Sequence, residues 1–178
     1  MKELKRTIRQ NVKASVAALS ADERGRLSEA VTAAVEALPE FDEAKTVLCF
    51  WSLPDEVCTH EFCNRWHTKK RILLPVVVGD VLELRLFCGE ERMATGAFGI
   101  KEPVGEAFES YGEIDLALIP GVSFDLDGHR LGRGKGYYDK LLPLISAKKI
   151  GLCFPVQITS TIPTDSWDIP MDAVVTAK

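Results

Sequence analysis

The stretches Ile114–Pro120, IDLALIP, and Arg130–Asp139, RLGRGKGYYD, decide the fold class of this chain. The first is a fully apolar run of strand length, which predicts a buried strand near the centre of a sheet. The second alternates three glycines with two cations and then continues as the start of a helix. A glycine-rich connection between a strand and a helix is typical of the ligand-binding end of an α/β sheet.

The rest of the chain repeats this alternation of helices and apolar strands. Apolar residues three or four positions apart predict an N-terminal helix, and Ser20–Glu23, SADE, is a capping box that opens a second helix ending at Pro39. Thr59–Lys69 is predicted to be a helix capped by Thr59. Strands are expected at Thr46–Trp51, Arg71–Val78, Val81–Phe87, Ile114–Pro120, Lys149–Phe154 and Asp172–Ala177.

This pattern predicts an α/β fold: a single layered domain, residues 1–178, with a mostly parallel sheet flanked by helices. Gly79-Asp80 reads as the turn of a hairpin between two of the strands. The polar segment Gly89–Glu113 is expected to be a long connection that includes some strand.

Composition excludes several classes of partner. The chain has 178 residues, 46% hydrophobic and 27% charged, and a net charge of -4, which argues against a broad nucleic-acid-binding face. No apolar run approaches the roughly 18–20 residues that span a bilayer, so no membrane partner is expected. The N-terminus lacks the apolar core of a signal peptide, and the five cysteines are irregularly spaced. We expect reduced thiols, a cytoplasmic location, a monomer and small-molecule ligands.

The glycine-rich loop predicts a site for a phosphate-bearing ligand. Glycines let backbone N–H groups approach a ligand closely, and a helix N-terminus attracts anions. Lys135 can neutralise charge on a transferring phosphoryl group, and Asp139 suits Mg²⁺, which binds through one or two carboxylates beside nucleotide phosphates. The spacing differs from the nucleotide P-loop and from the dinucleotide fingerprint.

The wider segment 118–142, LIPGVSFDLDGHRLGRGKGYYDKLL, resembles the signature of the 5-formyltetrahydrofolate cyclo-ligase family. The resemblance covers nearly the whole chain. It includes KRTIR at 5–9, FWSLPDEVCT at 50–59, GAFGIKEP at 96–103 and IPTDSWDIPMDAVVT at 162–176. Of these pieces, the central signature is long and specific, whereas the others are weak on their own.

The resemblance implies an enzyme that closes 5-formyltetrahydrofolate to 5,10-methenyltetrahydrofolate with ATP and Mg²⁺. Lys135 and Arg133 are then expected to stabilise phosphoryl transfer, with Asp139 and, by a looser match, Asp165 as metal ligands. The implied ATP contacts are Lys5, Arg9, Arg130, Leu131, Gly132, Arg133, Gly134, Lys135, Gly136, Tyr137 and Tyr138. The expected folate contacts are Leu53, Glu56, Cys58, Phe98, Arg133, Gly134, Lys135, Gly136 and Tyr137.

Two other functions stay open at this stage. The family usually has an acidic residue where this chain has Cys58, and a thiol is a poor partner for pterin N–H groups, which leaves a paralogue that activates another amide with ATP. A non-catalytic nucleotide-binding module is the second, although Lys135 and Asp139 argue against it. Phe98 fits a core position and a folate-stacking position equally well.

Several residues also have plain structural interpretations. Lys5 and Arg9 without the resemblance are typical of a solvated helix face. Asp125 and Asp127 are better explained by turn chemistry than as metal ligands. A zinc site is a weak possibility because its spacing is not a standard one; the residues concerned are Cys58, His60, Cys63 and His67.

Overall fold

The computed structural model describes residues 1–178 and is built around a six-stranded sheet in the order β10-β9-β6-β1-β2-β3. All neighbouring strands pair in parallel except β2 and β3, which form an antiparallel hairpin. This confirms the predicted mostly parallel sheet and places IDLALIP on a central strand. The strands are β1 Thr46–Leu48, β2 Arg71–Val78, β3 Val81–Leu86, β6 Leu116–Ile119, β9 Lys148–Leu152 and β10 Ala173–Val175.

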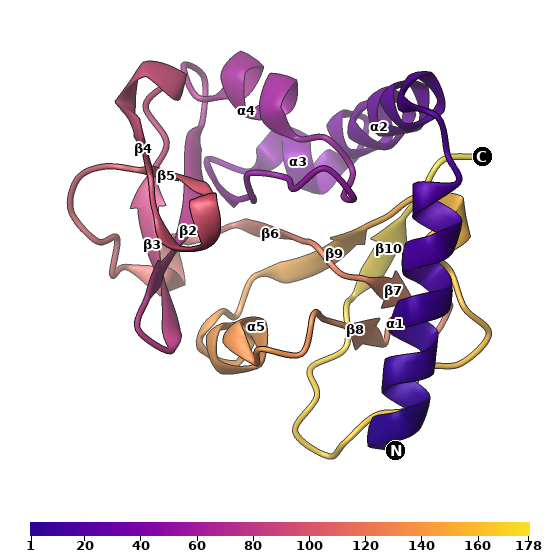
Figure 1. Ribbon diagram of the computed structural model, residues 1–178. Helices are drawn as coiled ribbons and strands as arrows, with labels where there is room; N and C mark the ends of the chain where they lie inside the picture. Colours follow the sequence, from indigo (N-terminus) through magenta and orange to yellow (C-terminus); the bar gives the residue numbers. More distant parts are fainter.

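Helices cover both faces of the sheet (Figure 1). The group α2, α3 and α4 lies over one face, α5 lies over the other, and α1 stands at the side beside the short strands β7 and β8. Their bounds are α1 Lys2–Ala17, α2 Ala21–Glu36, α3 Pro39–Glu43, α4 His60–Trp66 and α5 Tyr137–Leu141.

Successive strand residues point to opposite faces and enter two separate cores. In and just after β1, Val47 and Cys49 pack with residues of α1 to α4, whereas Leu48 packs with residues around α5. Strand β6 divides in the same way, with Leu118 on the first side and Ala117 on the second. Because both faces are covered, these strands read as continuous apolar runs in the sequence.

The capping prediction for α2 is confirmed, and Thr59 is the N-cap residue of α4 as predicted, although its side chain makes no capping hydrogen bond. Ser20 Oγ accepts a hydrogen bond from the Glu23 amide at 3.1 Å, and Glu23 Oε2 accepts one from the Ser20 amide at 2.7 Å. The Thr59 hydroxyl instead donates to the Phe50 carbonyl oxygen. Ser52 Oγ also accepts from the Thr59 amide at 3.0 Å, so this threonine fixes the segment after β1 rather than the helix end.

Two small hairpins lie outside the main sheet. The long connection predicted at Gly89–Glu113 contains β4 Met93–Thr95 paired with β5 Lys101–Pro103. The second hairpin pairs β7 Ser123–Phe124 with β8 Arg130–Leu131, and its turn contains Gly128 at φ +88°. Short 3₁₀ turns occur at Glu90–Arg92, Ala97–Gly99, Tyr111–Glu113, Leu142–Leu144 and Pro155–Gln157.

The strand order creates a crevice between β1 and β6. After β1 the chain continues to β2 on one side, whereas β6, which follows later, pairs with β1 on its other side. In open α/β sheets, ligands bind beyond the carboxyl ends of strands where the order reverses in this way. All five cysteine thiols are free, as expected. None of the helices has the length and apolar character needed to cross a membrane.

Candidate active site

A cavity of about 350 Å³ opens at the carboxyl ends of β1 and β6. Phe50, Trp51 and Leu53 follow β1 and form part of its wall, while Pro120 and Gly121 follow β6. The hairpin β2–β3 and the connection β4–β5 add apolar wall, and the glycine-rich loop 130–139 adds charge. A small-molecule site commonly has this combination of apolar lining and a few convergent polar groups.

The glycine-rich loop needs glycine at two positions. Gly134 has φ +98° and Gly136 has φ +74°, a backbone region that residues with a Cβ rarely adopt. Arg9 of α1 binds the loop backbone, because its Nε donates to the Gly132 carbonyl oxygen at 2.7 Å. Helix α5, which begins after Gly136, has only five residues. Anion attraction at this loop therefore depends on its amides and side-chain cations rather than on a long helix dipole.

Arg130 supplies a buried cation at the base of the loop. Its side chain is 7% exposed, and Nη1 donates to the Pro120 carbonyl oxygen at 3.1 Å. The guanidinium carbon lies 5.0 Å from the Tyr138 ring centroid, and Nη2 lies 3.6 Å from Asp139 Oδ1. Burial lowers the pKa of Arg130 below its ordinary value, an effect that the nearby Asp139 carboxylate opposes. An arginine remains protonated after such a shift, so the positive charge is permanent.

Arg133 is tied to the segment that follows β1. Its Nη2 lies 2.6 Å from Asp55 Oδ1 and 3.0 Å from Glu56 Oε1. Burial lowers the pKa of Arg133, but the two carboxylates raise it more, so the net shift is upward. Glu56 Oε2 accepts from the Leu53 amide at 2.9 Å, so one carboxylate joins the loop to the other wall of the cavity.

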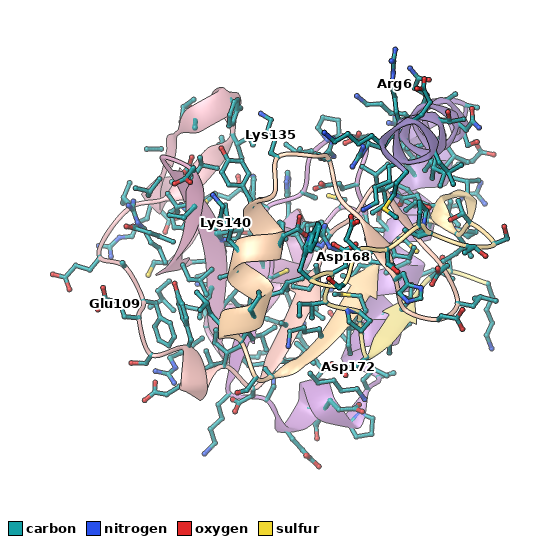
Figure 2. All side chains as sticks on the ribbon, turned by 90° about the horizontal axis from the view of Figure 1, so that it is seen from below. Arg6, Glu109, Lys135, Lys140, Asp168 and Asp172 are labelled. Atoms are coloured by element: carbon teal, nitrogen blue, oxygen red, sulfur yellow. The ribbon has the colours of Figure 1, made fainter.

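Lys135 contacts an aromatic ring across the cavity. Its Nζ lies 3.3 Å from the centroid of the Phe98 ring, a cation–π contact. Phe98 belongs to the connection between β4 and β5, is 64% exposed, and adopts φ +58°, the only non-glycine residue with positive φ. Figure 2 shows Lys135 on the loop that leads into α5. Phe98 is thus a cavity residue and not a core residue.

Lys5 reaches the cavity from α1 and pairs with the C-terminal segment. Its Nζ lies 2.8 Å from Asp165 Oδ2 and 3.5 Å from Asp168 Oδ2. Burial lowers the pKa of Lys5, but the hydrogen bond to Asp165 and the charge of Asp168 raise it by a larger amount. The net pKa therefore lies above its ordinary 10.5. Asp168 also accepts from the Asp165 amide at 2.8 Å and lines the cavity, whereas Asp165 does not (Figure 2 labels Asp168).

Two carboxylates near the cationic loop suit a magnesium ion. Asp139 and Asp168 both line the cavity, and the Asp139 side chain is 49% exposed. Magnesium is usually held by one or two carboxylates together with water and phosphate oxygens, so this donor set fits. Asp165 fits less well, because it lies off the cavity.

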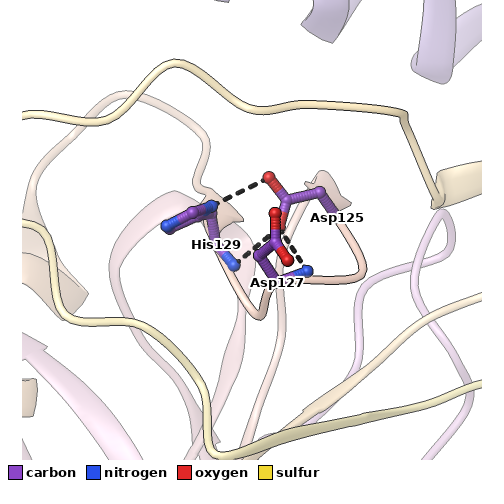
Figure 3. A group of neighbouring side chains, drawn as sticks. All are labelled: Asp125, Asp127 and His129. Carbon is purple, nitrogen blue, oxygen red and sulfur yellow. Dashed lines mark hydrogen bonds and ion pairs between the residues drawn. The ribbon is translucent and has the colours of Figure 1, made fainter.

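The cluster Asp125, Asp127 and His129 in the β7–β8 turn has another explanation (Figure 3). Asp125 Oδ1 accepts from the amides of Asp127 at 3.1 Å and His129 at 2.9 Å. Its Oδ2 accepts from the Ile162 amide and lies 2.9 Å from His129 Nδ1. This confirms the turn interpretation of Asp125, whose oxygens are already occupied.

The zinc alternative finds no support in the geometry. The His60 ring stacks on Trp51 with centroids 3.9 Å apart, and its Nε2 lies 3.0 Å from the Ser52 carbonyl oxygen. Cys63 is buried in the core and Cys58 is exposed. The cysteine–histidine set of the sequence does not form a cluster with metal-ligand spacing.

The cavity brings together most of the residues expected from the sequence. Tyr138 packs against the core and also lines the cavity, and Tyr137 lines the cavity with its hydroxyl 3.5 Å from the Gly79 carbonyl oxygen. Cys58 and Asp165 are the two expected site residues that do not line it. The expected residues on its wall are Lys5, Arg9, Leu53, Glu56, Phe98, Arg130, Leu131, Gly132, Arg133, Gly134, Lys135, Gly136, Tyr137, Tyr138 and Asp139.

Sequence reasoning missed Lys101, Glu102 and Asp168, which also line the cavity. Lys101 and Glu102 belong to the GAFGIKEP segment, in which only Phe98 was singled out. Asp168 lies three residues beyond Asp165 in the C-terminal segment, and only the fold distinguishes which of the two faces the cavity.

Comparisons with known proteins agree over nearly the full chain. The model of the 5-formyltetrahydrofolate cyclo-ligase family matches residues 1–177. The mouse 5-formyltetrahydrofolate cyclo-ligase is 34% identical, with 96% of this chain and 92% of the mouse protein covered. The Haemophilus influenzae 5-formyltetrahydrofolate cyclo-ligase is 30% identical, with 92% of each covered.

Solved structures give the same result. The Aquifex aeolicus 5,10-methenyltetrahydrofolate synthetase has a TM-score of 0.88 and 37% identity, covering 98% of this chain and 92% of that one. A 5,10-methenyltetrahydrofolate synthetase from Mycoplasma pneumoniae has a TM-score of 0.80 and 26% identity, and the match covers 98% of this chain and 99% of that one. With its sheet, its cationic glycine loop and these matches, the chain belongs to the 5-formyltetrahydrofolate cyclo-ligase family, a family of ligase enzymes.

Proposed function

We propose that this enzyme closes 5-formyltetrahydrofolate to 5,10-methenyltetrahydrofolate and consumes ATP and Mg²⁺ in doing so. The observation that carries the proposal is the division of one cavity into two kinds of wall. Cations and glycine amides of loop 130–136 form one wall, and flat apolar groups such as Trp51 and Phe98 form the other. A triphosphate suits the first wall, and the fused ring of a folate suits the second.

The chemistry proceeds in two steps. A formamide oxygen is a poor leaving group, so the γ-phosphoryl group of ATP is transferred to it and ADP departs. N10 of the folate then attacks the activated formyl carbon and releases its proton to solvent, the carbon–oxygen bond breaks, and inorganic phosphate leaves. Such a sequence depends mainly on positioning and on stabilisation of phosphoryl charge, which cations and amides supply.

The cations divide this work according to their contacts. Lys135 forms no ion pair with a carboxylate and contacts the Phe98 ring, so its charge is available to the transferring phosphoryl group. Arg130 is fixed and buried, so it offers a constant positive field below the loop. Arg133 pairs with Asp55 and Glu56, and we assign it the positioning of the loop against the folate wall.

Lys5 and Arg9 attach α1 to the nucleotide side of the cavity. Arg9 already binds the loop through Gly132, and Lys5 is held beside Asp168. When bound, Mg²⁺ would neutralise phosphate charge, and Asp139 and Asp168 are the carboxylates that would hold it.

Residues 1–178 act as one functional unit in this proposal, a monomeric domain whose substrates are small molecules. Its support is that Lys5, near one end of the chain, and Asp168, near the other, line the same cavity. A single elution volume matching one chain of 19.7 kDa in the presence of both substrates would support it. Elution as a dimer would contradict it.

The proposal is tested by a cyclisation assay. Purified protein is mixed with 5-formyltetrahydrofolate, Mg²⁺ and ATP, and the absorbance of the methenyl product is followed. Lys135→Ala is expected to lower kcat at least about 100-fold, as loss of a group that stabilises transition-state charge usually does. Lys140→Ala is the matched control, because Lys140 pairs with Asp80 on the surface.

Product that requires ATP and is lost only with Lys135→Ala is the expected result. Wild-type protein that binds ATP and yields no product would overturn the proposal. Such a result would favour a paralogue acting on a different amide. The position of Cys58 does not favour that alternative, since Cys58 is exposed and lies off the cavity.

A further inference from the structure

Glu102 is the carboxylate of the cavity that has no cationic partner. Three others line the wall, and each forms an ion pair: Glu56 with Arg133, Asp139 with Arg130, and Asp168 with Lys5. Glu102 forms none, although it is 7% exposed. The fully buried side-chain atoms that lack a hydrogen-bond partner do not include the Glu102 oxygens, so the free oxygen reaches open space, where a ligand in the cavity can donate to it.

The protein satisfies only one of the two oxygens. Glu102 Oε1 accepts a hydrogen bond from the Ala97 amide at 3.0 Å, and Oε2 has no hydrogen-bond partner in the protein. An ionised carboxylate accepts about four hydrogen bonds and donates none. Glu102 therefore offers at least three unused acceptor positions at the cavity wall, and it repels phosphate groups.

The β4–β5 hairpin is built to hold this side chain in place. A Cβ atom at Gly96 would lie 1.8 Å from Glu102 Oε1 and 2.2 Å from its Cδ, so the carboxylate can take this position only while residue 96 is glycine. The turn that follows contains Phe98 in its left-handed conformation. Residues held in such a conformation cluster at ligand sites, because the surrounding structure must compensate for the strain.

We propose that Glu102 determines specificity for the substrate ring by accepting hydrogen bonds from its N–H edge. The chemical class it recognises is a fused heterocycle with an amide N–H beside an exocyclic amine, which in a pterin are N3–H and the 2-amino group. The proposal rests on the function proposed above and deepens it. It supplies the acidic group that this chain lacks at exposed Cys58.

The charge pattern gives the bound substrate a direction. Lys135 and Arg130 lie at the loop side of the cavity, whereas Glu102 lies on the β4–β5 hairpin. Ring N–H groups are attracted to the Glu102 carboxylate, whereas Lys135 against Phe98 and Lys101 beside Glu102 attract anionic groups to the rest of the wall. The ring edge that carries the 2-amino group therefore binds at Glu102, with the Phe98 ring beside it.

The test uses Glu102→Gln, which keeps an oxygen for the Ala97 amide and replaces the other by an NH₂ group. Binding of 5-formyltetrahydrofolate is measured by calorimetry without ATP, and turnover is measured separately. We expect the dissociation constant and KM for the folate to rise about 10- to 100-fold, as for loss of a charged hydrogen bond. The KM for ATP and kcat should change less than about threefold. Glu106→Gln, an exposed residue of the same segment, is the matched control.

A modified substrate separates recognition from a purely structural role. A 2-desamino analogue of 5-formyltetrahydrofolate should bind wild-type protein about 10-fold or more weakly and bind Glu102→Gln no more weakly than the natural substrate. Equal affinity of the wild type for both compounds would overturn the proposal, even if the variant failed to fold. An unchanged folate KM in a folded, active Glu102→Gln would also overturn it. Failure of the wild type to turn over would instead count against the proposed function.

Discussion

Replacement of Asp125 by alanine should destabilise the protein strongly, although the residue lies outside the cavity. Its side chain is fully buried and accepts hydrogen bonds from the amides of Asp127, His129 and Ile162. It also pairs with the His129 ring at 2.9 Å. The β7–β8 turn is thereby joined to the start of the segment that carries Asp168.

The magnitude follows from the donors left behind. A buried N–H group without an acceptor costs about 1–3 kcal/mol. The Ile162 amide is buried, whereas the Asp127 and His129 amides are partly buried, so water recovers part of the cost there. With three amides affected, we expect a loss of about 3–5 kcal/mol in the free energy of unfolding. Asp125→Asn should lower the free energy of unfolding by less than Asp125→Ala does. One oxygen remains for the Asp127 and His129 amides, while the new NH₂ group faces the Ile162 amide. Asp127→Asn, in the same exposed turn, should leave the free energy of unfolding nearly unchanged.

This stabilisation should depend on pH. Burial raises the pKa of Asp125, but the Ile162 amide and His129 lower it more, to a net value below its ordinary 3.8. A carboxylate with a depressed folded pKa contributes its full stabilisation above the unfolded pKa and loses it as the pH falls through the folded one. The difference between wild type and Asp125→Ala should therefore shrink below about pH 4.

Urea unfolding, followed by circular dichroism at several pH values, measures these differences. A loss of less than about 1 kcal/mol for Asp125→Ala at pH 7 would refute the reasoning, since it would mean that the three amides find other acceptors at little cost. A difference that grew as the pH fell would refute the sign of the pKa shift.

Three further predictions concern the loop, the site boundary and the helix cap. Gly134→Ala, at φ +98°, should raise the KM for ATP about 10-fold while the melting temperature falls by only a few degrees, because the strain of roughly 1–2 kcal/mol is confined to the loop; an unchanged KM would show that the loop conformation is not needed. Cys58→Ser should leave the folate KM within about twofold, because Cys58 lies off the cavity; a rise of tenfold would return this residue to the folate site. Ser20→Ala should lower the free energy of unfolding by about 1 kcal/mol without changing kcat, by removing the acceptor for the Glu23 amide; thermal unfolding and the cyclisation assay check both parts.

Local sequence signals predicted the sheet well, because buried parallel strands leave unambiguous apolar runs. IDLALIP is central, and the SADE capping box forms with both of its hydrogen bonds. Thr59 is the N-cap residue of α4 as predicted, but its hydroxyl does not cap the helix, for a tertiary reason. The Phe50 carbonyl oxygen, nine residues earlier in the chain, takes its hydroxyl instead. No local pattern contains that partner.

The cationic loop of the site was also predictable, because its glycines and cations are contiguous in sequence. The remainder depends on how distant segments meet. Asp168 rather than Asp165 faces the cavity because of how the C-terminal segment packs against Lys5 of α1. The role of Gly96 is visible only once the Glu102 carboxylate is seen against its backbone. Such contacts between separate segments are set by the fold and not by spacing.

The central claim is that the formyl oxygen is activated by phosphoryl transfer inside this cavity. It is tested most directly with 5-formyltetrahydrofolate labelled with ¹⁸O in the formyl group, turned over with ATP and Mg²⁺. The account predicts one ¹⁸O atom in each molecule of inorganic phosphate released, at a rate equal to that of methenyl product formation. Methenyl product formed with unlabelled phosphate, the label appearing in water, would contradict it.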